Sequence, residues 1–102
     1  MLKRLFNLKE LYSSGLLAAL SIEFPGSAIV LFGSYSNGED TEDSDIDIAI
    51  IGYHEKEINI RLFEKLLQRS LQFHFFKKST DVHADLRENI INGVVLEGVL
   101  KI

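Results

Sequence analysis

The sequence has no cysteine, only one proline and no long apolar run. Without cysteine, neither a disulfide nor a thiolate metal site can form, so any bound metal must be held by oxygen or imidazole ligands. The apolar runs are far shorter than the ~20 residues that a helix needs to cross a bilayer. No secretory apolar stretch follows the first four residues. We therefore expect a cytoplasmic protein without a membrane segment.

An excess of basic residues is also lacking. The chain has 11 Lys and Arg against 15 Asp and Glu, giving a formal net charge of -4. Because proteins that grip nucleic acid through its phosphates rely on clustered Lys and Arg, this composition does not indicate a nucleic-acid partner. The acid is concentrated in one short stretch, which indicates either a site or a solvated loop. Its members are Glu39, Asp40, Glu42, Asp43, Asp45 and Asp47.

The length of 102 residues and the 46% hydrophobic content are typical of one ordinary domain with its own core. There is no internal repeat and no linker-like tract, so we predict a single domain over residues 1–102. Helical and strand-like patterns alternate along the chain. This order predicts the α/β (α+β) class, with one central mixed sheet of three to four strands flanked by about three to four helices.

The element boundaries follow from periodicity and from turn residues. Apolar residues recur every three or four positions up to Pro25-Gly26, which ends the first helix. The run Ala28 to Phe32 is continuously apolar and is typical of a strand buried on both faces. Asp81 is a plausible N-cap for the last helix, and Gly93 its stop signal. The pattern predicts helices over 5–24, 56–70 and 82–92, strands over 28–32, 45–51 and 71–76, and a fourth strand or irregular end over 94–100.

Two carboxylates open the second predicted strand. Side chains two residues apart on a strand share a face, so Asp45 and Asp47 should project together, while Ile46, Ile48 and Ile50 point into apolar packing. Two neighbouring carboxylates repel each other unless a cation neutralises them. Hard oxygen ligands of this kind suit Mg²⁺ held jointly with phosphate oxygens. The pair therefore predicts a metal-nucleotide site.

A glycine-serine turn directly follows the first buried strand, where ligands often bind in open α/β sheets. Gly33 has no Cβ, so a phosphate could approach the backbone closely, and Ser34 offers a hydroxyl beside the following amides. Gly38 would let the loop turn back towards Asp45. Each element alone is weak, and the combination is more specific.

The order strand, Gly33-Ser34, ten intervening residues, Asp45-Ile46-Asp47, strand resembles the signature of the polymerase-β-like nucleotidyltransferase superfamily, in particular its minimal, antitoxin-type domains. The segment 86–96 is similar to the ending of those small domains. The resemblance implies that Asp45 and Asp47 bind Mg²⁺ or Mn²⁺ and act in catalysis. It also implies nucleotide contacts from a second set of residues, namely Gly33, Ser34, Gly38 and Ser44.

The sequence departs from the family pattern at two places. Active members usually add a third carboxylate on a neighbouring strand, where this chain has His74. The imidazole could serve the site as a ligand or proton acceptor, or it could be structural, or the acid could come from Asp81 or Asp85. The loop Ser36-Asn37-Gly38 also lacks the basic residue that many members carry before the glycine.

The reaction that the resemblance implies is transfer of a nucleoside monophosphate, AMP from ATP, to a hydroxyl of a protein or RNA. Such small domains resemble antitoxins that adenylylate a helical partner ribonuclease, so a helical protein partner is expected, and a homo-oligomer is compatible with the sequence. The alternative is a nucleotide-binding regulatory module that has lost turnover with the third acid. A third interpretation treats the acidic loop as a solubility feature with nothing bound.

Overall fold

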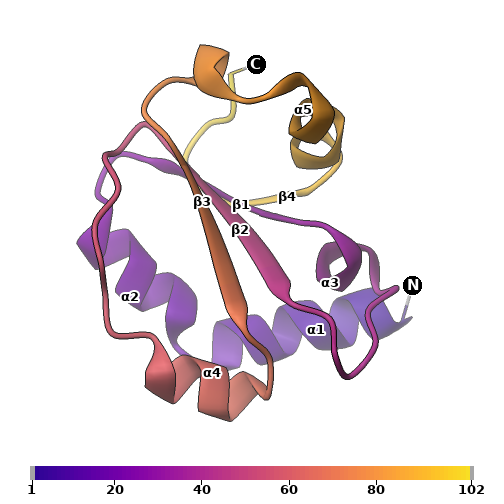
Figure 1. The fold of residues 1–102 in the computed structure, drawn as a ribbon. Coiled ribbons are helices and arrows are strands. Elements are labelled where there is room, and N and C mark those ends of the chain that lie inside the picture. The colour runs from indigo at the N-terminus through magenta and orange to yellow at the C-terminus, as the bar shows by residue number, and fades with distance from the viewer. Residues whose placement is uncertain (1, 102) are drawn as a thin grey trace.

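The structure is a computed structural model that describes residues 2–101. Within that range the chain forms five α-helices, four strands and one short 3₁₀ helix (Figure 1). In chain order they are α1 (Leu2–Ser13), α2 (Leu16–Glu23), β1 (Ala28–Phe32), α3 (Ser34–Asn37), β2 (Ile46–Ile51), α4 (Arg61–Leu67), β3 (Leu71–Phe76), η1 (Ser79–Asp81), α5 (Ala84–Ile91) and β4 (Val94–Glu97).

The strands form one mixed sheet in the order β3-β2-β1-β4. Strand β1 pairs antiparallel with both β2 and β4, whereas β2 and β3 run parallel. The predicted α+β class with a central mixed sheet is confirmed, and the tail forms the fourth strand. The helices within residues 2–101 are more numerous than predicted because the first one is broken and a short one follows β1.

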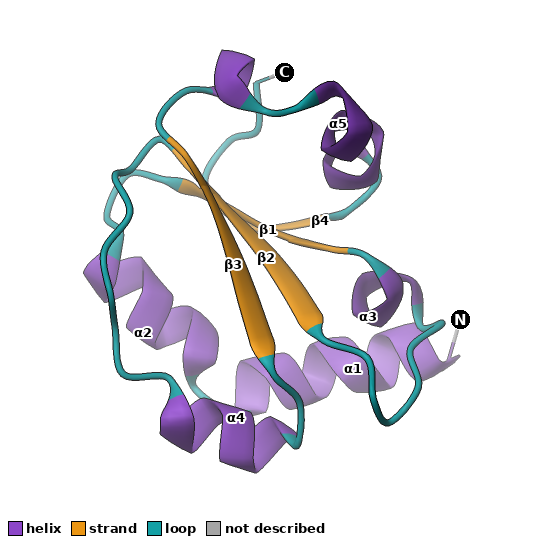
Figure 2. Cartoon of the chain, in the orientation of Figure 1, coloured by secondary structure: helices purple, strands orange, loops and turns teal. Residues whose placement is uncertain are grey.

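The two faces of the sheet are covered unequally. Helices α1, α2 and α4 lie on one face, here called the first face, and α5 lies on the opposite, second face (Figure 2). Alternation along β2 separates the two cores, because Ile46, Ile48 and Ile50 are buried in the first. Ala49 and Ile51 belong to the core of the second face, together with Ile90 of α5. None of the helices within residues 2–101 is long and apolar enough to cross a bilayer.

Three predicted boundaries are wrong for local reasons. The first helix breaks at Gly15, whose φ of 84° is left-handed, and the Ser14 hydroxyl accepts a hydrogen bond from the Leu16 N–H at 3.2 Å. Helix α4 begins only at Arg61, because Ile58 and Ile60 before it pack against the first core outside any helix. Asp81 is not the cap of the last helix, since it lies in η1.

Candidate active site

The glycine-serine turn lies beside one of the two predicted metal-binding carboxylates. Phe32, the last residue of β1, is the register partner of Asp47 in β2. At the next residue, Gly33, a Cβ would lie 2.7 Å from Asp47 Oδ2, and the backbone has φ 83° and ψ -164°. This conformation is essentially restricted to glycine. Gly33 therefore allows the carboxylate to sit against the end of β1.

His74 approaches the same carboxylate from the neighbouring strand. Its Nε2 lies 3.2 Å from Asp47 Oδ1, and its ring meets the Phe32 ring edge-on with centroids 5.1 Å apart. The two side chains remain about one third exposed, at 30% for Asp47 and 31% for His74. Both side chains lie on the second face, because they alternate along their strands with residues that pack in the first core. The pair is thus both mutually oriented and open to solvent.

Asp45 stands outside the strand ladder. Strand β2 begins at Ile46, whose N–H donates to the Ser70 carbonyl at 2.9 Å, and Asp45 is exposed immediately before it. Asp45 lines an open cavity of about 620 Å³ between the acidic loop and α4. The basic residues around this cavity are Arg61, Lys65 and Arg69. Asp45 therefore borders a mixed-charge hollow as well as the start of the strand that carries Asp47.

The other predicted nucleotide contacts have different surroundings. The Ser34 hydroxyl makes no hydrogen bond within residues 2–101. The Ser44 hydroxyl accepts a hydrogen bond from the Thr41 N–H at 2.9 Å, so it closes a turn inside the acidic loop. Gly38 packs against α1, because a Cβ there would lie 2.8 Å from the Arg4 nitrogen. Ser34 is free for a ligand, whereas Ser44 and Gly38 are occupied in shaping the loop.

A buried ionic network that the sequence analysis missed anchors the acidic loop. The Asp40 side chain is fully buried, and it accepts hydrogen bonds from Asn7 Nδ2 at 2.7 Å and Arg69 Nη2 at 3.1 Å. The half-exposed Lys3 Nζ lies 3.5 Å from Asp40 Oδ1. Burial alone raises the pKa of Asp40, but the hydrogen bonds from Asn7 and Arg69 and the charge of Lys3 outweigh it, so this pKa is lowered.

A polar residue on the inner side of a helix was the available signal for this network. Asn7 is 3% exposed in the middle of α1, and its amide also donates to the Tyr35 carbonyl at 3.0 Å. Buried amides need such partners. Burial, together with the charge of Asp40, raises the pKa of Tyr35 to about 12. The negative charge of Asp40 therefore disfavours loss of the phenolic proton of Tyr35, the residue that follows the glycine-serine turn.

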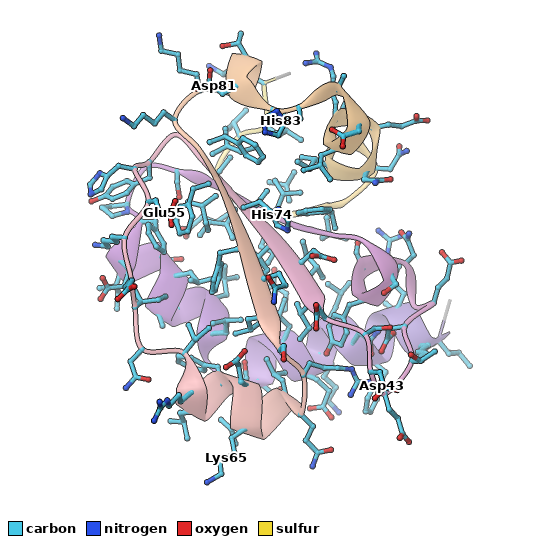
Figure 3. The ribbon with its side chains drawn as sticks, in the orientation of Figure 1. Asp43, Glu55, Lys65, His74, Asp81 and His83 are labelled. Atoms are coloured by element: carbon cyan, nitrogen blue, oxygen red, sulfur yellow. The ribbon has the colours of Figure 1, made fainter. Side chains whose placement is uncertain are left out.

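The alternative acids for the third position lie elsewhere. Asp81 accepts a hydrogen bond from the Lys78 N–H at 3.2 Å and closes η1, and Asp85 is exposed in the first turn of α5. Figure 3 shows Asp81 and His83 beyond the end of the sheet, away from His74. Within residues 2–101, no three His, Asp or Glu side chains gather closely enough to hold a metal ion by themselves. His74 and Asp47 are thus in contact with each other, whereas Asp45 lines the cavity beside α4.

Comparison with known proteins gives two matches. Residues 13–98 match the family described as "Nucleotidyltransferase domain". Over 39 residues the chain is 54% identical to the "Putative protein adenylyltransferase" of Methanocaldococcus jannaschii. That match covers 38% of this chain and 39% of the relative, so it spans about two fifths of the relative's length. No solved structure matches the chain.

Proposed function

The chain belongs to the nucleotidyltransferase domain family, and we propose that it transfers AMP from ATP to a hydroxyl group of a protein. The observation that carries this proposal is the approach of the Asp47 carboxylate to Gly33 and His74 on the open part of the second face. The choice of AMP and of a protein acceptor is supported by the name of the Methanocaldococcus relative.

The triphosphate would be bound at the end of β1. Gly33 leaves the backbone without a side chain, and the free Ser34 hydroxyl offers a donor next to it. Gly38 and Ser44 would act indirectly in this arrangement, by holding the loop that carries Asp45. Arg61 and Lys65 line the same cavity as Asp45, and their positive charges would attract the negatively charged substrate.

The donor set fits Mg²⁺ held jointly with substrate phosphates. Mg²⁺ is usually bound through one or two carboxylates plus phosphates and water, and not by a closed cage of protein ligands. Asp45 and Asp47 are two such carboxylates, separated by one residue and both reachable from solvent. They would hold the ion, which when bound neutralises the triphosphate and stabilises charge on the leaving group.

In the proposed reaction, an acceptor hydroxyl oxygen attacks the α-phosphorus of ATP. The bond from that phosphorus to the bridging oxygen breaks, and pyrophosphate leaves with the electron pair. An imidazole can accept the hydroxyl proton near neutral pH. His74 is the group available for this role, because the Asp47 carboxylate fixes one of its ring nitrogens at 3.2 Å. Orientation and electrostatics would supply most of the catalysis.

Labelling experiments test the proposal directly. The chain is incubated with Mg²⁺, ATP labelled at the α-phosphate and a helical protein as candidate acceptor. We expect label on the protein, with matching pyrophosphate release. Asp47→Asn should lower the rate by about 100-fold or more, because a charge aimed at the reacting phosphates is lost. Glu39→Gln is the matched control, since this exposed carboxylate lies in the acidic loop but does not line the cavity that contains Asp45.

Label that persists in the double variant Asp45→Asn plus Asp47→Asn would contradict the proposed site. A role as antitoxin to a helical ribonuclease is the most specific form of the proposal. In co-expression, the wild-type chain should then relieve growth inhibition by that ribonuclease, and the Asp47→Asn variant should not.

A regulatory module that binds ATP without turnover is the second candidate, because a histidine stands in place of a third carboxylate. Calorimetric titration with ATP and Mg²⁺ gives binding under both functions, whereas pyrophosphate release occurs only with the enzyme. Replacing His74 by Asp and by Ala separates them further. A gain of activity with Asp indicates a weakened metal site, and loss with Ala but not Asp supports proton transfer by this position.

A further inference from the structure

Strand β3 forms one outer edge of the sheet, and residues 55–60 border the side chains of Phe73 and Phe75 without forming a further strand beside it. It is the last strand in the order β3-β2-β1-β4, and Figure 1 shows it nearest the viewer, with no other segment drawn in front of it. Its six residues, Leu71–Phe76, include neither a charged side chain nor a proline. Proteins normally blunt such an edge with charges, proline or a bulge. The opposite edge, β4, does carry these features, because it has four residues, ends in Glu97 and contains a register shift against β1.

The backbone groups at the open edge can be identified from the ladder with β2. Ile46 N–H donates to the Ser70 carbonyl, and Gly52 N–H donates to the Phe76 carbonyl. Because strand residues alternate in direction, the even-numbered residues of β3 bond to β2 and the odd-numbered ones point outwards. Leu71 N–H is already bonded to Glu64 Oε2 at 2.8 Å. Within residues 2–101, the backbone groups of Phe73 and Phe75 have no partner.

We propose that this edge binds the same edge of a second copy, antiparallel, with the two-fold axis at His74. In this register Phe73 of each copy lies opposite Phe75 of the other, as a hydrogen-bonded pair that exchanges both N–H to carbonyl bonds. All the free backbone groups of Phe73 and Phe75 are then used, and the contact of Leu71 with Glu64 is left intact. The two sheets become one continuous sheet.

Other antiparallel registers that stay within the six residues of β3 satisfy fewer groups. With the axis at Phe73, Phe75 would face Leu71 of the second copy, whose N–H is already bonded to Glu64, so the Phe75 carbonyl would stay unpaired. Registers that pair an odd-numbered with an even-numbered residue fail, because the even-numbered groups are bonded to β2. A second copy therefore fits this edge by its own symmetry.

The pairing would join the two candidate active sites. The two copies of His74 face each other at the axis as a non-hydrogen-bonded pair. Side chains lie closest in such a pair, so the two imidazoles are neighbours. Both lie on the face that carries Asp47, which His74 contacts within its own chain. Each site would thus gain a residue from the second copy. This inference does not depend on nucleotide transfer.

Cysteine cross-linking tests the register, because the natural chain has no cysteine. In the proposed dimer the two Cα atoms at position 74 lie about 4.5 Å apart, within the range for a disulfide. His74→Cys should therefore form a disulfide-linked dimer on mild oxidation. Gln72→Cys is the matched control, since it faces Phe76 of the second copy and should stay monomeric. Cross-linking of Gln72→Cys as fast as His74→Cys, or no cross-linking of either, would overturn the proposal.

Sedimentation equilibrium of the unmodified chain gives an independent measurement. An interface this small is expected to be weak, so the series extends into the millimolar range. The mass should rise from 11.6 kDa towards twice that value. Phe75→Pro removes an outward N–H and leaves the ladder to β2 intact, so it should abolish the rise, whereas Phe75→Ala should keep most of it.

Circular dichroism shows whether the proline variant folds. If it does not, amide hydrogen exchange of the natural chain replaces it. Protection of the Phe73 and Phe75 amides that increases with concentration supports the dimer, and rapid exchange at every concentration refutes it.

Discussion

Asp40→Asn removes one charge from a buried network while keeping the shape of the side chain. The carboxylate is fully buried and receives hydrogen bonds from Asn7 and Arg69. Breaking a buried ion pair by removing one partner costs about 3–5 kcal/mol. Lys3 is half-exposed, so its contact adds little, and the Arg69 side chain keeps 18% exposure. We therefore expect a loss of about 3 kcal/mol in the free energy of unfolding, at the low end of that range.

Urea unfolding followed by circular dichroism measures this loss. With a slope of roughly 1.5 kcal/mol per molar, the midpoint of the Asp40→Asn variant should fall by about 2 M at pH 7. Asp43→Asn provides the control in the same loop. Because that residue is exposed, its free energy of unfolding should change by less than about 0.5 kcal/mol. A loss below about 1 kcal/mol for Asp40→Asn would refute the view that the network is shielded from water.

The pH dependence of this difference follows from the lowered pKa of Asp40. A carboxyl whose pKa is lower in the folded than in the unfolded chain adds stability above the ordinary value of about 3.9, and that stability is lost as the pH falls through the folded pKa. The gap between wild type and Asp40→Asn should therefore be constant from pH 5 to 7 and close below about pH 4. A gap that stays unchanged in acid would contradict the network as its cause.

Three further changes have defined outcomes. Gly33→Ala should cost about 2 kcal/mol in urea unfolding and weaken ATP binding in calorimetry, because its Cβ would lie 2.7 Å from the Asp47 carboxylate in a glycine-only conformation. Gly98→Ala places a Cβ 2.5 Å from the Ser27 carbonyl and should destabilise more than Gly26→Ala, which has a similar φ but open space; equal losses in urea would refute the steric cause. The pKa of Tyr35 is about 12 in the folded chain, above its ordinary value of 10.0, so this residue should lower the thermal stability as the pH rises above about 10. Thermal unfolding of Tyr35→Phe should lack this loss of stability with pH.

The strands could be predicted from the sequence because their signals are local. A continuous apolar run marks β1, and alternation in β2 already separates the isoleucines from Asp47. The break at Gly15 could not be predicted, since apolar residues keep the helical spacing on both sides of it. The late start of α4 was missed because Ile58 and Ile60 satisfy the helical pattern while packing as an irregular segment.

The contacts within the candidate site also divide into those that the sequence pattern favours and those that it does not report. The approach of Gly33 to Asp47 depends on the antiparallel register of neighbouring strands, which the turn length and the alternating pattern favour. The Asp40 network joins residues 33 and 29 positions apart, and no periodic pattern reports such a pairing. Likewise, His74 could be located on its strand from the sequence, but its contact with Asp47 required the parallel pairing of β2 and β3.

The acidic loop is fixed by the protein before any ligand arrives. Gly38 rests on the backbone of α1, Asp40 is held by Asn7, and Ile46 enters the ladder beside Ser70. Helix α1 lies almost entirely before the matched family region of 13–98, so the chain positions its loop with residues outside that region. A loop that is already ordered need not lose conformational entropy when it binds a ligand. The repulsion among its exposed carboxylates is then the main unfavourable term that a bound cation would relieve.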